Sequence, residues 1–300
     1  MYIEWLGQPD CHLRSRTGGK ASQLSRLAAD YRIPPGYCVT ATAFEQWNTN
    51  AEQAKGLPAE LCVALLAAYA ELGDLCGVSE LPVAVRSSSV VEDGSIFSFA
   101  GLYETVLNVI GGERLVDAVL SCWASARSER VLAYTSHNRL PASTSMAVLV
   151  QELVAGDVAA VVFSMNPITG DADEVVINAN WGLGASIVNG TVDPDSYIVR
   201  KSDFDIMRRA VAEKRLMTVP LRGGGIAEVE VQKSRRNSTS LRDDQIREVA
   251  RLAVDLEKSI GGPIEIEATY SNEKLSLLQC RPITALGQET RFTQQDKSRG

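Results

Sequence analysis

Ile264–Tyr270, with the sequence IEIEATY, predicts a β-strand that carries two acids on one face. Glu265 and Glu267 alternate with apolar residues in this segment. Residues two apart on a strand project to the same side, so the two carboxylates lie on one face, about 7 Å apart. A short polar break follows, and the segment therefore predicts the first half of a polar hairpin.

Leu275–Arg281, with the sequence LSLLQCR, predicts the second half of that hairpin. Gln279 and Arg281 share a face of this strand in the same way. Carboxylate and amide oxygens bind hard cations, and a guanidinium steadies phosphate charge. The hairpin therefore predicts a site for a metal ion with a nucleotide, and the alternative is a solvated edge hairpin.

The register of the hairpin decides whether its polar side chains share one site. A four-residue loop pairs Tyr270 with Leu275 and puts the two glutamates on the face opposite the glutamine and the arginine. One shared site requires an odd-length connection or a β-bulge. We predict the odd-length connection, most simply Tyr270 to Lys274, which pairs Thr269 with Leu275.

Two further segments carry residues suited to phosphate. Thr17–Leu24 (TGGKASQL) places Lys20 just inside a predicted helix. Val83–Val109 begins with a short apolar strand that delivers Arg86 into a loop rich in serine and glycine, whose N–H groups and hydroxyls can cradle phosphate oxygens. The alternatives are a solvated lysine and an arginine paired with an acid of the same loop.

With the polar hairpin, the order of these motifs resembles the nucleotide-binding domain of phosphoenolpyruvate synthase, pyruvate phosphate dikinase and rifampin phosphotransferase. The resemblance runs from about Leu6 to Thr284 and includes the glycine-rich stretch Asn178–Val199. It implies an α+β fold of the ATP-grasp type, with two lobes and the nucleotide between them. We expect the first lobe over residues 1–190, the second over 191–285, and a polar tail over 286–300.

The resemblance also implies roles for individual residues. Lys20, Arg86 and Arg281 match positions that bind and neutralise phosphate, and are the expected catalytic residues. Glu267 and Gln279 stand at the spacing of the metal-binding acid and glutamine of the dikinases, and are the expected Mg²⁺ ligands. Charge neutralisation explains the set, because a transferring phosphoryl group spreads negative charge that cations must meet.

Further residues are expected to contact ATP. Besides the catalytic and metal-binding residues, these cofactor-binding positions are Ser87, Gly101, Gln151, Glu152, Val154 and Glu265. The chain departs from many relatives at Ala185, where they carry an acid. This difference weakens any catalytic or metal role for the glycine-rich stretch.

The phosphoryl acceptor is expected to lie outside this chain. Relatives continue into a domain whose histidine is phosphorylated, whereas neither His12 nor His137 stands in such a motif. Three hypotheses remain open. The chain is an ATP-dependent phosphotransferase that acts on a histidine of a separate protein, a free-standing kinase or ligase for a small molecule, or a nucleotide-binding module without turnover.

Composition excludes several classes of protein. The 300 residues are 45% hydrophobic and 22% charged, with a net charge of −7, which argues against nucleic acid as a partner. No apolar run approaches the length of a membrane span and no signal-peptide layout is present, so we expect a cytoplasmic protein without membrane contact. The six scattered cysteines predict buried free thiols, not a zinc site or disulfides.

Periodicity predicts interleaved helices and strands. We expect helices over residues 17–30 and 58–73, and one long amphipathic helix over 113–134. Residues 146–154 and 158–164 predict two strands of an antiparallel hairpin. Because helices and strands do not alternate regularly, we expect an α+β fold in place of a doubly wound sheet.

Overall fold

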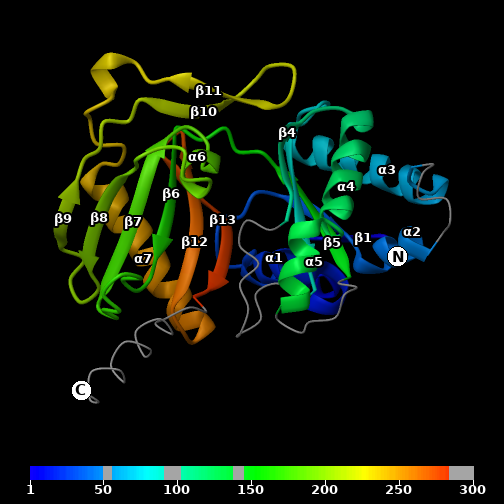
Figure 1. The fold of residues 1–300 in the computed structure, drawn as a ribbon, viewed down its shortest axis with the longest axis horizontal. Coiled ribbons are helices and arrows are strands. Elements are labelled where there is room, and N and C mark those ends of the chain that lie inside the picture. Colours follow the sequence, from blue (N-terminus) through cyan, green and yellow to red (C-terminus); the bar gives the residue numbers. More distant parts are fainter. Residues whose placement is uncertain (50–55, 91–102, 138–144, 284–300) are drawn as a thin grey trace, which may run out of the picture.

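The computed structural model describes residues 1–49, 56–90, 103–137 and 145–283. Within this part of the chain, the strands form two large sheets and a small one, which lie side by side with helices packed on them (Figure 1). All strand pairs in the sheets are antiparallel. This arrangement confirms the predicted α+β class.

The strands of each sheet follow in spatial order. The first sheet consists of β1 (Ile3–Trp5), β2 (Gly36–Val39), β5 (Met146–Glu152), β3 (Val83–Ser89) and β4 (Thr105–Val109). The second sheet consists of β13 (Lys274–Pro282), β12 (Ile264–Ser271), β6 (Val158–Phe163), β7 (Glu174–Trp181), β8 (Asp195–Arg200) and β9 (Ile206–Ala210). The small sheet is the pair β10 (Leu216–Pro220) and β11 (Ile226–Glu230).

Helices pack on the faces of both large sheets and between them. They are η1 (Pro9–His12), α1 (Arg14–Leu27), α2 (Ala41–Thr49), α3 (Ala59–Cys76), α4 (Gly112–Ser125), α5 (Glu129–His137), α6 (Ala185–Val188), η3 (Lys233–Arg235) and α7 (Asp243–Ile260). Within the described part of the chain, none of the helices combines the length and the hydrophobicity of a membrane span. The predicted cytoplasmic location stays a prediction.

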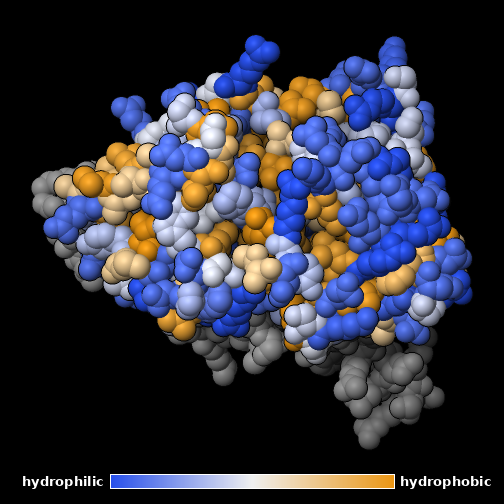
Figure 2. Space-filling model, turned by 180° about the vertical axis from the view of Figure 1, so that it is seen from behind, coloured by the Kyte–Doolittle hydropathy of each residue, from blue (hydrophilic) through white to orange (hydrophobic). Residues whose placement is uncertain are grey.

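Helix α7 shows how the apolar pattern sets the packing. Ile246, Val249, Ala253 and Leu256 are buried and recur at helical spacing, so they form one face that packs on the second sheet. The helix ends at Gly261, whose φ of 84° suits the left-handed cap of a helix. Its outer face is polar, and the right half of the molecule seen from behind is mostly hydrophilic (Figure 2).

The core consists of two clusters of buried side chains. One lies between the first sheet and helices α2, α3 and α4, where Trp47 and Trp123 approach to 5.2 Å between ring centroids. The other lies between the second sheet and α7. Ala21 and Leu24 of α1 belong to this second cluster, while α1 also contacts β3 and β5 of the first sheet. Helix α1 therefore joins the two halves of the fold.

Two predictions of local structure are wrong. The single helix over 113–134 is broken into α4 and α5, because Ser128 starts a new helix and its hydroxyl accepts from the N–H of Val131. The predicted hairpin of 146–154 with 158–164 does not form, because β5 pairs with β2 and β3 and β6 pairs with β12 and β7. The chain passes from the first sheet to the second between these strands, whereas the predicted lobe boundary near residue 190 stays a prediction.

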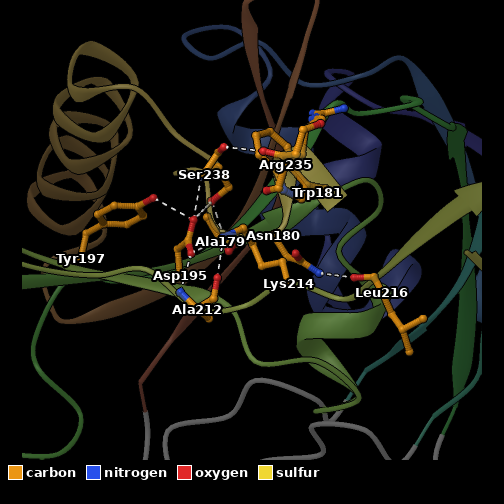
Figure 3. Close-up of polar contacts among 12 residues, drawn as sticks. Ala179, Asn180, Trp181, Asp195, Tyr197, Ala212, Lys214, Leu216, Arg235 and Ser238 are labelled. Carbon is orange, nitrogen blue, oxygen red and sulfur yellow. Dashed lines mark hydrogen bonds and ion pairs between the residues drawn. The ribbon is translucent and has the colours of Figure 1, made fainter. Parts of the chain in front are cut away.

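A buried polar network stabilises the second sheet (Figure 3). Asp195 and Lys214 are both fully buried, and their oxygen and nitrogen atoms lie 2.6 Å apart. Asp195 also accepts from the backbone N–H groups of Ala212 and Ser240, at 2.9 and 2.7 Å, and from the Ser240 hydroxyl. The network joins β8 to the chain before β10 and to the chain before α7. It therefore places the small sheet relative to the large one.

Candidate functional site

A cleft of about 440 Å³ lies between the two large sheets. Its size suits a ligand of nucleotide dimensions. It is lined from both sides by most of the residues predicted for the site, namely Lys20, Arg86, Gln151, Glu152, Val154, Glu267, Gln279 and Arg281. Ser87 and Glu265 do not line it, and Gly101 lies outside the described residues.

The turn of the polar hairpin differs from the predicted one. Tyr270 pairs with Leu275, so the odd-length connection with Thr269 opposite Leu275 is wrong. Asn272 and Glu273 alone join the strands, with φ of 49° and 64°. Two consecutive residues in the left-handed region are typical of a type I′ turn, which matches the twist of the strands that it connects.

A β-bulge restores the shared face that the site requires. The register shifts by one residue after Glu267, which leaves Leu278 as an extra residue of β13. Beyond this bulge Glu267 lies opposite Gln279, and Glu265 lies opposite Arg281. The alternative route to one shared site, a bulge, is therefore the one that the chain takes.

Arg86 binds this hairpin from the other sheet. Its Nη2 donates to Gln279 Oε1 at 2.5 Å and to a carboxylate oxygen of Glu267 at 3.1 Å. Its Nη1 donates to the carbonyl oxygen of Leu278 at 2.7 Å. The bulge thus presents a carbonyl to the same guanidinium, and Arg86 is only 8% exposed. The predicted phosphate-binding arginine and the predicted metal ligands are in direct contact.

Lys20 reaches the same cleft from α1. Its Nζ donates to the carbonyl oxygen of Ser87 at 3.1 Å. Gly18 brings the helix close to β3, because its φ is 74° and a Cβ there would lie 1.9 Å from the carbonyl oxygen of Ser88. The Ser88 hydroxyl donates to the Thr17 carbonyl at 2.7 Å. Ser88 therefore docks α1 on the strand that carries Arg86.

Ser87 and Gln151 have structural partners. The Ser87 hydroxyl donates to the carbonyl oxygen of Glu104 at 2.9 Å, so this arrangement gives no support to its predicted phosphate contact. The Gln151 amide donates to the carbonyl oxygen of Pro34 at 2.9 Å, and the side chain is buried. Gln151 thereby holds the strand end at the wall of the cleft.

Glu152 and the hairpin acids differ in their electrostatic surroundings. Partial burial raises the pKa of Glu152, and Arg32 opposes this shift. Glu265 is paired with Arg281, with 2.6 Å between the carboxylate oxygen and Nη2. That ion pair fixes the Arg281 side chain beside the cleft.

Several residues at the cleft carried no signal in the sequence analysis. They are apolar residues such as Leu107 and Ile226. Ala185, where many relatives of the predicted family carry an acid, also lines the cleft. Such residues shape a pocket without any chemistry of their own, so pattern alone does not find them.

Comparison with known proteins identifies the family. The model of the pyruvate phosphate dikinase AMP/ATP-binding domain matches residues 53–299. The chain belongs to this family. The predicted resemblance to this family is therefore confirmed, and the cleft is the candidate nucleotide site of the domain.

Individual relatives of this domain belong to longer proteins. A probable phosphoenolpyruvate synthase of Methanocaldococcus jannaschii is 34% identical over 95% of this chain and 27% of its own length. The prodigiosin synthesizing transferase PigC of Serratia marcescens is 36% identical over 90% of this chain and 32% of its own length. The uncharacterized phosphotransferase YvkC of Bacillus subtilis is 39% identical over 72% of this chain and 26% of its own length. This chain thus spans about a quarter to a third of these relatives.

Proposed function

We propose that the cleft binds ATP with Mg²⁺ and that the domain transfers a phosphoryl group from ATP to an acceptor. The observation that carries this proposal is the contact of Arg86 with Glu267 and Gln279. It brings a cation suited to phosphate and two oxygen ligands suited to a metal to one place in the cleft. The phosphoenolpyruvate synthase and phosphotransferase names of the relatives support the same reaction class.

The donor set of the hairpin fits magnesium. Glu267 and Gln279 supply a carboxylate and an amide oxygen side by side, and both already accept from the positive guanidinium of Arg86. Among the described residues, no group of three or more His, Cys, Asp or Glu side chains is suited to hold a metal. Mg²⁺ commonly takes one or two protein ligands and completes its shell with phosphates and water. We therefore infer that the metal binds together with the nucleotide.

Each cation of the site has a proposed task. Mg²⁺, when bound, neutralises charge that develops on the transferring phosphoryl group. Lys20 and Arg86 bind phosphate oxygens from the side of the first sheet, and Arg281 does so from the hairpin. Their fixed positions supply stabilisation without reorganisation during the reaction.

The acceptor is proposed to lie on another molecule. It is a histidine of a separate phosphohistidine domain or a small molecule, and the relationship to a prodigiosin synthesizing transferase keeps the second alternative open. A nucleotide-binding module without turnover is the third candidate, and Ala185 at the cleft is the observation that favours it.

An ATP turnover assay distinguishes these functions. Purified protein is incubated with Mg-ATP, with and without candidate acceptors, and the products are separated by chromatography. AMP with phosphate indicates dikinase chemistry, and ADP indicates a simple kinase or ligase. Nucleotide binding without turnover in the presence of each candidate acceptor would support the nucleotide-binding module and overturn the proposed phosphoryl transfer.

A further inference from the structure

The β10–β11 hairpin reaches from the second half of the fold across to the first (Figure 1). Its tip is held by Asn108 of β4. The Nδ2 of Asn108 donates to the carbonyl oxygens of Leu221 and Gly225, at 2.8 and 2.6 Å. The N–H of Gly225 in turn donates to the carbonyl oxygen of Asn108 at 2.8 Å. One residue therefore makes three hydrogen bonds to a segment more than 100 positions away.

The contact is closely fitted on both sides. Asn108 is 2% exposed and has a φ of 59°, a conformation that asparagine tolerates better than most residues. The guanidinium of Arg114 donates to the carbonyl oxygen of Gly223 beside it. Gly224 has a φ of 97°, and a Cβ there would lie 2.4 Å from Arg114 Nη1. The tip therefore packs so closely on the first half that a side chain at Gly224 would clash with Arg114.

The middle of β10 in the same hairpin contacts the glycine-rich loop of the cleft. The N–H of Leu183 donates to the carbonyl oxygen of Thr218 at 2.9 Å. Gly182 passes so close that a Cβ there would lie 2.3 Å from that oxygen. Residues on both sides of this connection line the cleft, namely Leu107, Leu183, Gly184, Ala185 and Ile226.

We propose that Asn108 is a positioning residue that holds the β10–β11 hairpin across the cleft. Its three hydrogen bonds to Leu221 and Gly225 are called the latch. Through Thr218 the latched hairpin holds the glycine-rich loop in place, so the two halves of the fold are tied together at the wall of the site. Release of the latch frees the tip, loosens the loop and lets a bound nucleotide leave faster. This last consequence rests on the proposed function, whereas the latch itself does not.

The test compares three variants with the wild type by amide hydrogen exchange in nucleotide-free protein. Asn108→Asp keeps the size and the tolerance of positive φ but replaces the donor by a carboxylate that repels both carbonyls. Asn108→Gly keeps the conformation and removes the side chain. The matched control is Asn272→Gly, an exposed asparagine that also has positive φ.

We expect exchange at Gly225 and Leu183 to rise at least about tenfold in both Asn108 variants and to stay unchanged in the control, because local opening governs exchange and the latch restrains it. Unchanged exchange at Gly225 would overturn the latch. A rise at Gly225 without one at Leu183 would overturn the coupling to the glycine-rich loop.

A second measurement separates the latch from the proposed function. Dissociation of a fluorescent, non-hydrolysable ATP analogue is followed by stopped flow with Mg²⁺ present. We expect it to be about tenfold faster in Asn108→Asp than in wild type and control. If the analogue does not bind the wild type at all, the proposed function fails while the exchange result still decides the latch. Equal dissociation rates in proteins that bind the analogue would overturn the effect of the latch on the ligand.

Discussion

Glu267 lies directly opposite Gln279 because Leu278 is an extra residue in β13. Without this bulge, the pairing of Tyr270 with Leu275 would place the two side chains on opposite faces of the sheet. The bulge also turns the Leu278 carbonyl toward Arg86, which binds both side chains. The arrangement of the candidate metal site thus depends on one inserted residue.

Removing the charge of Glu267 is expected to abolish Mg²⁺-dependent ATP consumption. Glu267→Gln keeps an oxygen that accepts from Arg86 but removes the negative charge that a metal needs, and we expect turnover to fall by about 10²–10³-fold. The matched control on the same hairpin is Glu273→Gln, whose side chain is 79% exposed in the turn. Full activity of Glu267→Gln would contradict the assignment of Glu267 as a metal ligand.

Gln279 calls for a different expectation. It is only 6% exposed and accepts the shortest hydrogen bond of Arg86, so Gln279→Ala leaves a buried guanidinium with one partner fewer. We expect Gln279→Ala to lose Mg²⁺-dependent turnover, as Glu267→Gln does. Unlike Glu267→Gln, it is also expected to have a lower midpoint of thermal unfolding. Calorimetry beside the turnover assay checks this, and an unchanged midpoint would contradict it.

Lys20→Ala and Arg86→Ala are expected to weaken ATP binding or turnover by about 2–4 kcal/mol each, because each removes a preorganised positive charge from the phosphates. Arg86→Ala also breaks the contact between the two sheets, whereas the Lys20 contact is with a carbonyl of its own half. Titration calorimetry with an ATP analogue measures the loss. Arg200→Ala, at an exposed ion pair, is the control. Wild-type affinity in both site variants would contradict the assignment of the phosphate site.

The pair of Lys214 with Asp195 is expected to be important for stability. Lys214→Met leaves a fully buried carboxylate without its cation, and we expect a loss of about 3–5 kcal/mol in the free energy of unfolding. Arg215→Met, next in the chain, breaks an exposed pair and is expected to cost less than about 1 kcal/mol. Urea denaturation checks both values. Equal losses would show that burial of the pair does not matter.

The buried thiols are expected to resist alkylation in the native state. Burial raises the pKa of Cys11 to about 11 and that of Cys122 to about 12, so both stay protonated at pH 8, and the thiolate is the reactive form. Cys62 and Cys76 are only half-buried and are expected to react first. Mass spectrometry of peptides after iodoacetamide treatment, with and without denaturant, measures this. Rapid native labelling of Cys11 would contradict the packing of η1.

The two histidines are expected to take no part in phosphoryl transfer. His12 lies in η1 and is not among the described residues that line the cleft, and His137 is the last residue of α5. Replacing each by asparagine is expected to leave ATP turnover nearly unchanged. Incubation with radiolabelled ATP followed by acid-free electrophoresis gives the second readout. A phosphoryl group on either histidine would show that the acceptor lies within this chain.

The sequence by itself determined which side chains share a face of a strand or helix, and so which residues are candidates for the site. Alternation along β12 put Glu265 and Glu267 on one face, and the apolar run before Arg86 predicted a strand that aims it. The apolar repeat of residues 58–73 likewise predicted a helix, which the structure has as α3. These features are local, because the face of a side chain on a strand or helix follows from spacing alone.

The tertiary structure decided how those residues meet. The pairing of β5 and β6 with strands of different sheets, the bulge at Leu278 and the contact of Asn108 with the tip of the β10–β11 hairpin all join segments far apart in the chain. Local spacing does not choose between a hairpin and separate sheets, because the choice depends on which distant strand offers the better buried partner. The acids and cations were readable in the sequence, and only packing of the two sheets against each other made them one site.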